Sequence, residues 1–339
     1  MATLTFKDFK SDQEVRWCPG CGDHAVLAAL QRALPKVSQA LNYDKERYVV
    51  VSGIGCSSRL PYYMDTYGFH SIHGRATAIS TGIKVANPWL TVWQACGDGD
   101  ALAIGGNHFI HAIRRNIDIN ISLFTPQIDG LTKGQYSPTS KFGAITKTSP
   151  YGTVEHPFNP GALVLGAKGT FFARSLDVEL KLNEEIMTAA ALHDGCSVME
   201  MLTNCVIFND GAHKDLSDPA VKADHTIVLR QGERMIFGKN RDKGLIYDGK
   251  KIRAVHIGEG GFTEEDILIH DAHTDNIGIH MALAEMKGPD YPVALGVIRD
   301  VKDITYDDGV RDQVKEVMMK SQIHCVDDLL HSGSKWEVE

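Results

Sequence analysis

Short apolar runs alternate along the first 210 residues with stretches in which apolar residues recur at helical spacing. The runs at 48–51, 90–93 and 197–202 have the length and composition of buried strands. Between such runs, apolar positions at 76–86 and 102–113 recur as they do on one face of a helix. Strands that alternate with helices in this way form a parallel sheet covered on both faces. The pattern therefore predicts a doubly wound α/β fold.

The pattern changes after residue 210, where short β segments with charged turns replace the regular alternation. We therefore expect two domains, a doubly wound domain over 1–210 and a C-terminal α+β extension over 211–339. Within the first domain, apolar positions at helical spacing follow Asp23. Pro35 is predicted to end this helix, because a proline in a helix interior removes a backbone hydrogen bond.

Composition and charge narrow the class of protein. The chain has 339 residues, 43% of them hydrophobic, and can bury a substantial core. A formal net charge of −8, without a Lys/Arg-rich run, argues against general nucleic-acid binding. The sequence shows no signal peptide and no apolar run long enough to span a bilayer. Seven cysteines in such a chain indicate thiols or metal ligands rather than a disulfide framework. We expect a cytoplasmic protein that binds neither nucleic acid nor a membrane.

The strand at 90–93 runs into a glycine-rich turn, Gly-Asp-Gly-Asp at 97–100, and a helix follows. Gly97 and Gly99 allow a bulky anion to approach the backbone, and the helix N-terminus adds positive potential. A carboxylate such as Asp98 can lie beside a phosphate only with a cation between them, and Mg²⁺ suits that position. The alternative is that Asp98 and its neighbour Asp100 merely cap the helix.

Four cysteines fall in loops at the same predicted edge of the sheet, two of them in a Cys-x-x-Cys turn: Cys18, Cys21, Cys56 and Cys205. Four thiolates that converge there fit a zinc ion or an iron–sulfur cluster, and spacing alone does not separate the two. The Cys-x-x-Cys turn alone also fits a redox pair. The other three lie in or beside apolar runs and are predicted to be inert core residues: Cys96, Cys196 and Cys325.

Six ordered segments carry a resemblance to one family: Trp-Cys-Pro-Gly-Cys-Gly-Asp at 17–23, Gly-Ile-Gly-Cys-Ser-Ser-Arg at 53–59, His-Gly-Arg at 73–75, Gly-Asp-Gly-Asp-Ala-Leu-Ala-Ile-Gly-Gly-Asn-His at 97–108, Gly-Leu-Thr-Lys-Gly-Gln-Tyr-Ser-Pro-Thr-Ser at 130–140, and Asn-Cys-x-Ile-Phe-Asn-Asp-Gly at 204–211. Together they resemble the beta subunit of 2-oxoacid:ferredoxin oxidoreductases, most closely the 2-oxoglutarate type. The similarity covers roughly residues 7–215 and continues more weakly to the end.

The resemblance implies a thiamine diphosphate enzyme in which this chain supplies the diphosphate-binding domain and Mg²⁺ site. A partner alpha, or fused alpha-gamma, subunit would bring the pyrimidine-binding domain, in an (alpha-beta)₂ assembly. The four loop cysteines would hold a [4Fe-4S] cluster. The implied reaction is reversible: 2-oxoglutarate, coenzyme A and oxidised ferredoxin give succinyl-coenzyme A, CO₂ and reduced ferredoxin.

The resemblance also implies residue roles. Asp98 would ligate Mg²⁺, in a turn shaped by Gly97, Gly99 and Asp100. Nine residues would lie along the cofactor: Gly55, Cys56, Ser57, Ser58, His73, Gly74, Gly130, Leu131 and Thr132. Arg59, Lys133 and His73 are the predicted catalytic residues. The two cations would bind the anionic end of the 2-oxoacid or coenzyme A. Solvated surface charges, and a structural histidine at 73, are the alternatives.

One stretch departs from the family pattern. Family members usually read Asn-Asn-Glu-Ile-Tyr-Gly-Leu-Thr where this chain reads Thr-Pro-Gln-Ile-Asp-Gly-Leu-Thr at 125–132. The second Mg²⁺-ligating side chain is expected at Pro126, which offers none. The Thr125 hydroxyl, Asp129 or water could complete the octahedron, with the Ile128 carbonyl as a further ligand. We predict weaker cofactor retention than is usual, unless this variant re-routes coordination without cost.

Other interpretations remain open at this stage. The substrate could be pyruvate or a branched-chain 2-oxoacid. The chain could instead be a catalytically impaired or non-catalytic subunit whose site has decayed at 125–129. A zinc-stapled binding protein is a third possibility. In the C-terminal part, the acidic and histidine residues at 270–275 resemble a metal cluster, but a polar turn before the next helix is the prediction.

Overall fold

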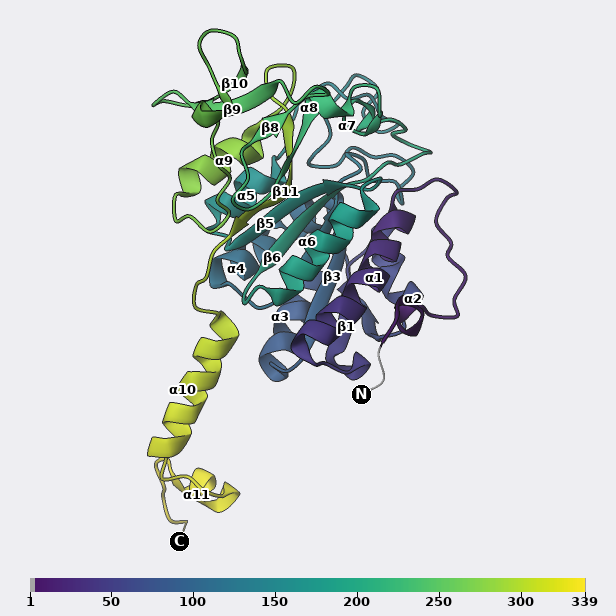
Figure 1. The fold of residues 1–339 in the computed structure, drawn as a ribbon. Helices are drawn as coiled ribbons and strands as arrows, with labels where there is room; N and C mark the ends of the chain where they lie inside the picture. Colours follow the sequence, from purple (N-terminus) through teal and green to yellow (C-terminus); the bar gives the residue numbers. More distant parts are fainter. Residues whose placement is uncertain (1–3, 339) are drawn as a thin grey trace.

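The computed structural model describes residues 4–338, and its centre is an eight-stranded sheet in the order β2-β1-β3-β4-β6-β5-β11-β7 (Figure 1). The strands are β1 (Tyr48–Ser52), β2 (Tyr67–His70), β3 (Thr91–Gly97), β4 (Asn120–Phe124), β5 (Phe171–Leu176), β6 (Ser197–Leu202), β7 (Thr226–Leu229) and β11 (Val293–Asp300). Neighbouring strands are parallel except β5 and β11, which are antiparallel. The predicted α/β class is confirmed.

Helices cover both faces of this sheet, with α1 and α6 on one face and α3, α4, α5 and α9 on the other (Figure 1). Their bounds are α1 (Asp23–Leu41), α3 (Ala76–Ala86), α4 (Gly106–Arg115), α5 (Pro160–Gly166), α6 (Leu180–Leu192) and α9 (Ile277–Glu285). Along β1, Val49 and Val51 join one apolar core, and Tyr48 and Val50 join the other. Because both faces are buried, the strand reads as an unbroken apolar run.

The helix α1 does not end at Pro35 as predicted but continues to Leu41 with the proline inside it. Leu34 and Val37, on either side of the proline, are both fully buried in the core beside α6. The apolar contacts of this face offset the hydrogen bond that the proline removes. The apolar spacing beyond residue 35 was therefore the stronger signal.

The chain after residue 210 is not a separate layer, because two of its strands, β7 and β11, complete the main sheet. The rest forms a small antiparallel sheet of β8 (Ile236–Phe237), β9 (Lys243–Tyr247) and β10 (Ile252–His256). The boundary expected at 210 thus falls within one continuous sheet. Residues 1–3 and 339 of the expected domains lie outside the described residues.

The C-terminal arm, defined as α10 (Tyr306–Lys320) and α11 (Val326–His331), extends away from the body (Figure 1). Its base is fixed where the Asp118 amide donates to the Asp307 carboxylate, 3.1 Å away. Cys325, predicted to be a core residue, is exposed at the start of α11, where no core exists to bury it. Cys96 and Cys196 are buried as predicted.

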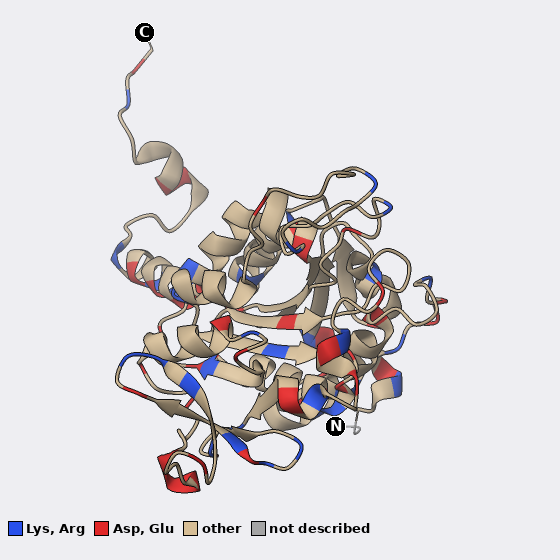
Figure 2. Ribbon diagram, turned by 90° about the horizontal axis from the view of Figure 1, so that it is seen from above, with Lys and Arg blue, Asp and Glu red and all other residues tan. Residues whose placement is uncertain are grey.

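Short helical segments complete the description: Phe6–Phe9, Lys45–Arg47, Ser57–Arg59, α2 (Leu60–Tyr63), Gly99–Ile104, α7 (Lys214–Ser217), α8 (Lys222–His225) and Glu264–Asp266. Lys and Arg are interspersed with Asp and Glu over the ribbon (Figure 2). Within residues 4–338, no helix is both long and apolar enough to cross a membrane.

Candidate functional site

The loops that follow β1, β3, β4 and β6 meet at the carboxyl edge of the sheet and enclose a cleft of about 240 Å³. In a doubly wound sheet this edge is where ligands bind. The cleft brings together the Gly-Asp-Gly-Asp turn, all four loop cysteines and part of the long loop at 125–160. A second chamber of about 420 Å³ adjoins it. The sequence prediction that these segments converge is therefore fulfilled in space.

Asp98, at the end of β3, is 1% exposed. Its carboxylate accepts hydrogen bonds from the Gly99 amide at 3.0 Å, from the Ser137 hydroxyl at 2.6 Å and from the Thr139 hydroxyl. Burial raises the pKa of Asp98 to about 6, although these three donors oppose the rise. Asp98 does cap the short helix that follows, but the long loop also holds it. The sequence analysis did not predict that Ser137 and Thr139 bind Asp98, although both lie in the motif at 130–140.

Asp100 has a different role from Asp98. One of its oxygens, Oδ1, accepts from the Ile54 amide at 3.1 Å and the Gly74 amide at 2.7 Å, and lies 2.6 Å from His73 Nδ1. A Cβ on Gly53 would lie 1.9 Å from the other oxygen, so only glycine fits there. Asp100 therefore ties the loop after β1 to the His-Gly-Arg loop. The contact with Asp100 supports the alternative that His73 is a structural histidine. The His73 side chain nevertheless remains partly exposed.

A second carboxylate, that of Asp129, lies at the Gly-Asp-Gly-Asp turn. The Asp129 amide donates to the Gln135 carbonyl at 2.8 Å, and the Gly134 amide donates back to the Asp129 carbonyl at 3.0 Å, which closes a tight turn. A Cβ on Gly99 would lie only 3.4 Å from Asp129 Oδ2. Burial raises the pKa of Asp129, and nearby His73 opposes that rise. The carboxylates of Asp98 and Asp129 thus both lie beside Gly99.

Thr125 does not line the cleft. Its hydroxyl, which is buried, donates to the Met201 carbonyl at 3.0 Å. The side chain therefore faces β6, and the expectation that it ligates Mg²⁺ gains no support from its position. Pro126 and Ile128 do line the cleft, as do Gly130 and Leu131 at the tip of the loop. The neighbouring Thr132 is exposed and donates its hydroxyl proton to the Asp129 carbonyl.

The four loop cysteines form one wall of the cleft, which we call the cysteine wall: Cys18, Cys21, Cys56 and Cys205. A Cβ on Gly130 would lie 3.5 Å from the Cys205 sulfur and 3.7 Å from the Cys56 sulfur. Burial is the main cause that raises the pKa of Cys56, to about 11. All four are free thiols. Among residues 4–338, no three His, Cys, Asp or Glu side chains are close enough to bind a single metal ion.

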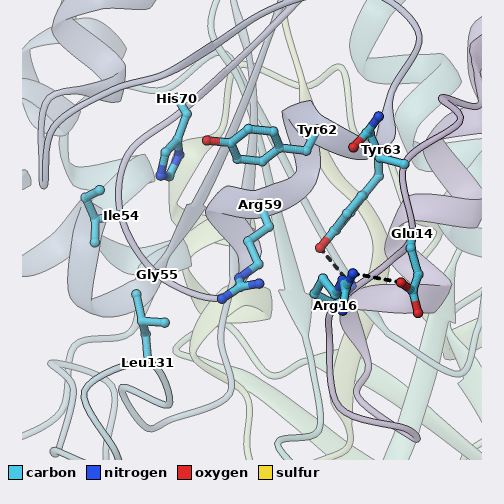
Figure 3. Close-up of a pocket in the computed structure, with 10 residues that line it drawn as sticks. Glu14, Arg16, Ile54, Gly55, Arg59, Tyr62, Tyr63, His70 and Leu131 are labelled. Carbon is cyan, nitrogen blue, oxygen red and sulfur yellow. Dashed lines mark hydrogen bonds and ion pairs between the residues drawn. The ribbon is translucent and has the colours of Figure 1, made fainter.

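The second chamber is lined by cationic and aromatic side chains (Figure 3). Arg16 pairs with Glu14 at 2.8 Å, whereas Arg59 has no ion pair within the described part of the chain. His70, whose Nδ1 lies 2.9 Å from the Ser52 hydroxyl, and Tyr62 complete this side. The two chambers share five residues: Arg16, Ile54, Gly55, Arg59 and Leu131. The cleft with its carboxylates and the second chamber are therefore continuous, and Arg59 borders both of them.

The backbone around the cleft leaves room for a ligand. Gly55 has a φ of +134°, and a Cβ built there would meet nothing within 4 Å. A Cβ on Gly97 would meet only the Ser57 hydroxyl, at 3.7 Å. The buried hydroxyls of Ser58 and Thr203 make no hydrogen bond within the described residues, and Thr203 lines the cleft. Open glycines beside unpaired hydroxyls fit a polar cofactor. The exposed Lys133 lies at the rim of the cleft.

Residues 270–275 form the predicted polar turn. His270 Nε2 lies 2.8 Å from the Val297 carbonyl oxygen, and His273 Nδ1 lies 2.6 Å from the Asp300 carbonyl oxygen. Asp271 accepts from the Gln231 amide at 2.9 Å. These side chains bind the protein itself and do not converge on one point.

Comparisons with known proteins agree with this geometry. Residues 53–201 match the family described as thiamine pyrophosphate enzyme, C-terminal TPP binding domain. The 2-oxoglutarate oxidoreductase subunit KorB of Mycobacterium tuberculosis is 45% identical over 98% of this chain and 88% of its own length. The 2-oxoglutarate synthase subunit KorB of Archaeoglobus fulgidus is 46% identical over 56% of this chain and 69% of its own length.

A solved structure is similar over nearly the whole chain. It is a 2-oxoglutarate:ferredoxin oxidoreductase from Magnetococcus marinus with 2-oxoglutarate, coenzyme A and succinyl-CoA bound. The two share 29% sequence identity and a TM-score of 0.77, over 99% of this chain and 98% of the other. The predicted family and the oxidoreductase class are confirmed. The chain belongs to the beta subunits of the 2-oxoacid:ferredoxin oxidoreductases, of the 2-oxoglutarate type.

Proposed function

We propose that this chain is the beta subunit of a coenzyme A-dependent 2-oxoglutarate:ferredoxin oxidoreductase that uses thiamine diphosphate, Mg²⁺ and a [4Fe-4S] cluster. The observation that carries the proposal is a single cleft that unites the Gly-Asp-Gly-Asp turn with its buried aspartates, the cysteine wall and Arg59, which forms no ion pair with the described residues. Each feature matches one requirement of the reaction: a metal-bridged diphosphate, one-electron transfer and an anionic substrate.

The residues around the turn fit thiamine diphosphate. Gly97 and Gly99 let the diphosphate approach the backbone, and Asp98 would hold the Mg²⁺ that bridges to it. Gly55 and the Ser57 side chain border the same open space. When bound, thiamine diphosphate supplies a thiazolium that stabilises a carbanion after loss of CO₂. The polypeptide contributes orientation and charge compensation around that group.

The cysteine wall would hold the [4Fe-4S] cluster. The four cysteines border one cleft, and within residues 4–338 no three His, Cys, Asp or Glu side chains are close enough to bind one metal ion. Thiolates that bind a cluster of several irons lie farther apart than those that bind one zinc ion, so this spacing favours the cluster. Gly130 lies against the Cys56 and Cys205 sulfurs and follows Asp129, which lies at the diphosphate turn. One short loop segment therefore borders both groups. Such proximity favours electron transfer from the cofactor to the cluster and then to ferredoxin.

Arg59 and Lys133 would bind the anions of the reaction. Arg59 is shared by both chambers and has no ion pair in the described residues, so a carboxylate there would gain a charge-assisted hydrogen bond. Lys133 reaches the rim from the opposite loop. These positions suit the distal carboxylate of 2-oxoglutarate or the phosphates of coenzyme A. His73, joined to Asp100, would hold the loop beside the cofactor.

A partner alpha subunit would cover the open side of the cleft and form an (alpha-beta)₂ assembly. Large apolar side chains are exposed on the loops after β2, β4 and β6 and in the short helix after β3: Ile72, Ile104, Ile145, Val154 and Ile207. Ile207 also lines the cleft, and the other four lie on segments that follow the strands at its edge. Exposed apolar side chains on such segments suit contact with a permanent protein partner.

A specific observation favours a second candidate, a catalytically impaired subunit. Pro126 has no ligating side chain, and the Thr125 hydroxyl faces β6. If nothing replaces the missing ligand, the fold and the cysteine wall would persist without cofactor binding. Weak retention of thiamine diphosphate during purification would then accompany a complete cluster.

The test is one analysis of the complex purified anaerobically with its partner subunit. Iron, acid-labile sulfide, zinc and thiamine diphosphate are measured together. Coenzyme A-dependent reduction of a viologen dye is then compared for 2-oxoglutarate, pyruvate and a branched-chain 2-oxoacid. About four iron and four sulfide per beta chain, with bound cofactor and highest turnover of 2-oxoglutarate, would support the proposal. A complete cluster without cofactor or turnover would establish the impaired subunit, and zinc in place of iron would refute both.

A further inference from the structure

We propose that the Asp129 carboxylate is the second protein side chain that binds the Mg²⁺ of the diphosphate site. Asp98 would be the first, and the Ile128 carbonyl would complete the protein ligands. This inference rests on the proposed function, because the metal is useful only with a diphosphate beside it. It gives the chain a metal site of two carboxylates on two different loops.

The position of Asp129 supports this role. Its Oδ2 lies 3.4 Å from where a Cβ of Gly99 would be, and Gly99 directly follows Asp98. The Asp129 side chain lines the same cleft as Asp98 and the three residues around it. Its backbone is fixed by the paired hydrogen bonds with Gln135 and Gly134. The carboxylate is therefore held at the turn by the fold and not by a flexible loop end.

Other oxygen groups near the turn are already engaged. Asp100 uses one oxygen for two backbone amides and His73, and the other packs against Gly53. The Thr125 hydroxyl binds the Met201 carbonyl. Pro126 has no side-chain oxygen. Among the described carboxylates at this turn, Asp129 is the one besides Asp98 that is placed to bind a cation, and a carboxylate is a stronger ligand for Mg²⁺ than the neighbouring hydroxyls.

A site with two carboxylates has a distinct electrostatic behaviour. Without a metal, both carboxylates repel the diphosphate, since each is close enough for a strong interaction in a partly buried site. With Mg²⁺, the same carboxylates attract the metal and the metal attracts the diphosphate. Cofactor binding in this chain should therefore depend steeply on Mg²⁺. Removing the charge of Asp129 should weaken metal binding and at the same time relieve the repulsion.

The experiment compares Asp129→Asn with the wild type and with Glu155→Gln, each in complex with the partner subunit. Glu155 is an exposed carboxylate on the same long loop and binds the Tyr136 hydroxyl, so it is a matched control. Calorimetry gives the dissociation constant of thiamine diphosphate in excess Mg²⁺ and in EDTA. Mg²⁺ is then titrated at saturating thiamine diphosphate. The electron paramagnetic resonance spectrum of bound Mn²⁺ reports the ligand field without any turnover.

The expected result has opposite signs in the two conditions. Asp129→Asn weakens Mg²⁺ binding by about tenfold or more, but binds thiamine diphosphate in EDTA at least as tightly as the wild type does. The Mn²⁺ spectrum changes, and Glu155→Gln matches the wild type throughout. Asp129→Ala, which keeps no oxygen, must shift in the same direction and replaces Asn if that variant fails to assemble.

Two results overturn the inference, and they can be told apart from failure of the proposed function. Unchanged Mg²⁺ affinity and an unchanged Mn²⁺ spectrum in both variants would show that Asp129 is not a ligand, while cofactor binding by the wild type would keep the proposed function intact. A wild-type complex that binds no thiamine diphosphate at any Mg²⁺ concentration would refute the proposed function, and the inference with it.

Discussion

Buried carboxylates occur in two regions of this molecule, and their surroundings differ. In the sheet interior, Glu200 on β6 accepts from Arg174 Nε on β5 at 2.6 Å, and the same arginine also donates to the Ala284 carbonyl at 3.1 Å. At the sheet edge, Asp98 accepts only from an amide and two hydroxyls, and Asp129 lies nearby. Glu200 has its cation within the chain, whereas Asp98 forms no ion pair with any residue in 4–338.

The difference separates structural charge from ligand-binding charge. The ion pair inside the sheet, with the bond to Ala284, holds two neighbouring strands and the end of α9 together, and it needs no ligand from outside the chain. Uncompensated buried carboxylates cost stability in the free protein, because burial disfavours the charged form. Such carboxylates are expected where a bound cation stabilises their charged form. Buried carboxylates without an ion pair among the described residues are therefore the feature that favours a cation-binding site in this cleft.

The largest expected effect comes from breaking the compensated pair. Arg174→Met leaves Glu200 buried without its cation and should lower the free energy of unfolding by about 3–5 kcal/mol. Denaturant unfolding measures this change. Arg311→Met, which removes an exposed pair with Asp308 on the C-terminal arm, is the control and should cost less than about 1 kcal/mol. Equal losses in both variants would show that the buried pair is no more important for stability than the exposed one.

A substitution at Asp98, in the cleft, should weaken cofactor binding without lowering the free energy of unfolding. Asp98→Asn removes the charge that we propose binds the metal, so the affinity for Mg²⁺ and thiamine diphosphate should fall by about 100-fold. The amide can still accept from Ser137 and Thr139, and the cofactor-free chain should unfold at the same denaturant concentration or a higher one. Calorimetry and denaturant unfolding measure the two quantities. A marked loss of stability would mean that Asp98 is structural.

A smaller effect concerns pH. Burial raises the pKa of Asp98 in the folded chain to about 6, above its unfolded value, so the folded state binds the extra proton between these values. The Asp98 contribution to stability is therefore favourable in acid and is lost as pH rises through about 6. Without metal, Asp98→Asn should stabilise the chain relative to wild type by roughly 1–3 kcal/mol more at pH 7.5 than at pH 4.5. Denaturant unfolding at both pH values, in EDTA, checks this difference.

The smallest effect concerns Arg59, which forms no ion pair with the described residues. Arg59→Met should raise the KM for 2-oxoglutarate about tenfold, equivalent to about 1.4 kcal/mol, with a smaller change in kcat. Steady-state dye reduction by the complex measures both. Arg16→Met, which removes a cation already paired with Glu14 in the same chamber, should change KM less. A larger effect at Arg16 would reassign the anion site.

Local pattern was enough to predict strands such as β1, β3 and β6 and the edge at which the candidate site forms. A strand such as β1, buried on both faces, must be an apolar run, and parallel strands bring their carboxyl ends together. Asp98 and the four loop cysteines could therefore be assigned to one cleft before any coordinates were known. The same local reasoning failed at Pro35, where burial of the helix face outweighs the local preference of proline.

Other features depend on contacts between distant residues. Ser137 and Thr139 bind Asp98 from about 40 positions away, through a loop without regular structure. No periodicity predicts which side chains of such a loop face inward. The turn of Thr125 toward Met201 and the closeness of Asp129 to Gly99 depend on the same loop path. The late strands β7 and β11 likewise enter the main sheet through long-range pairing.

The late arrival of β11 has a consequence for synthesis of the chain. One edge of β5 pairs with β6, and its other edge pairs with β11. The residues of β11 are synthesised long after those of β5 and β6. Roughly 120 residues must be translated between β5 and β11, which takes about 6–25 s at ribosomal rates. During that interval the nascent sheet has an open, apolar edge that can join the edge of a neighbouring chain. Chaperone binding to nascent chains should therefore peak before residue 293 is made and fall once β11 leaves the ribosome.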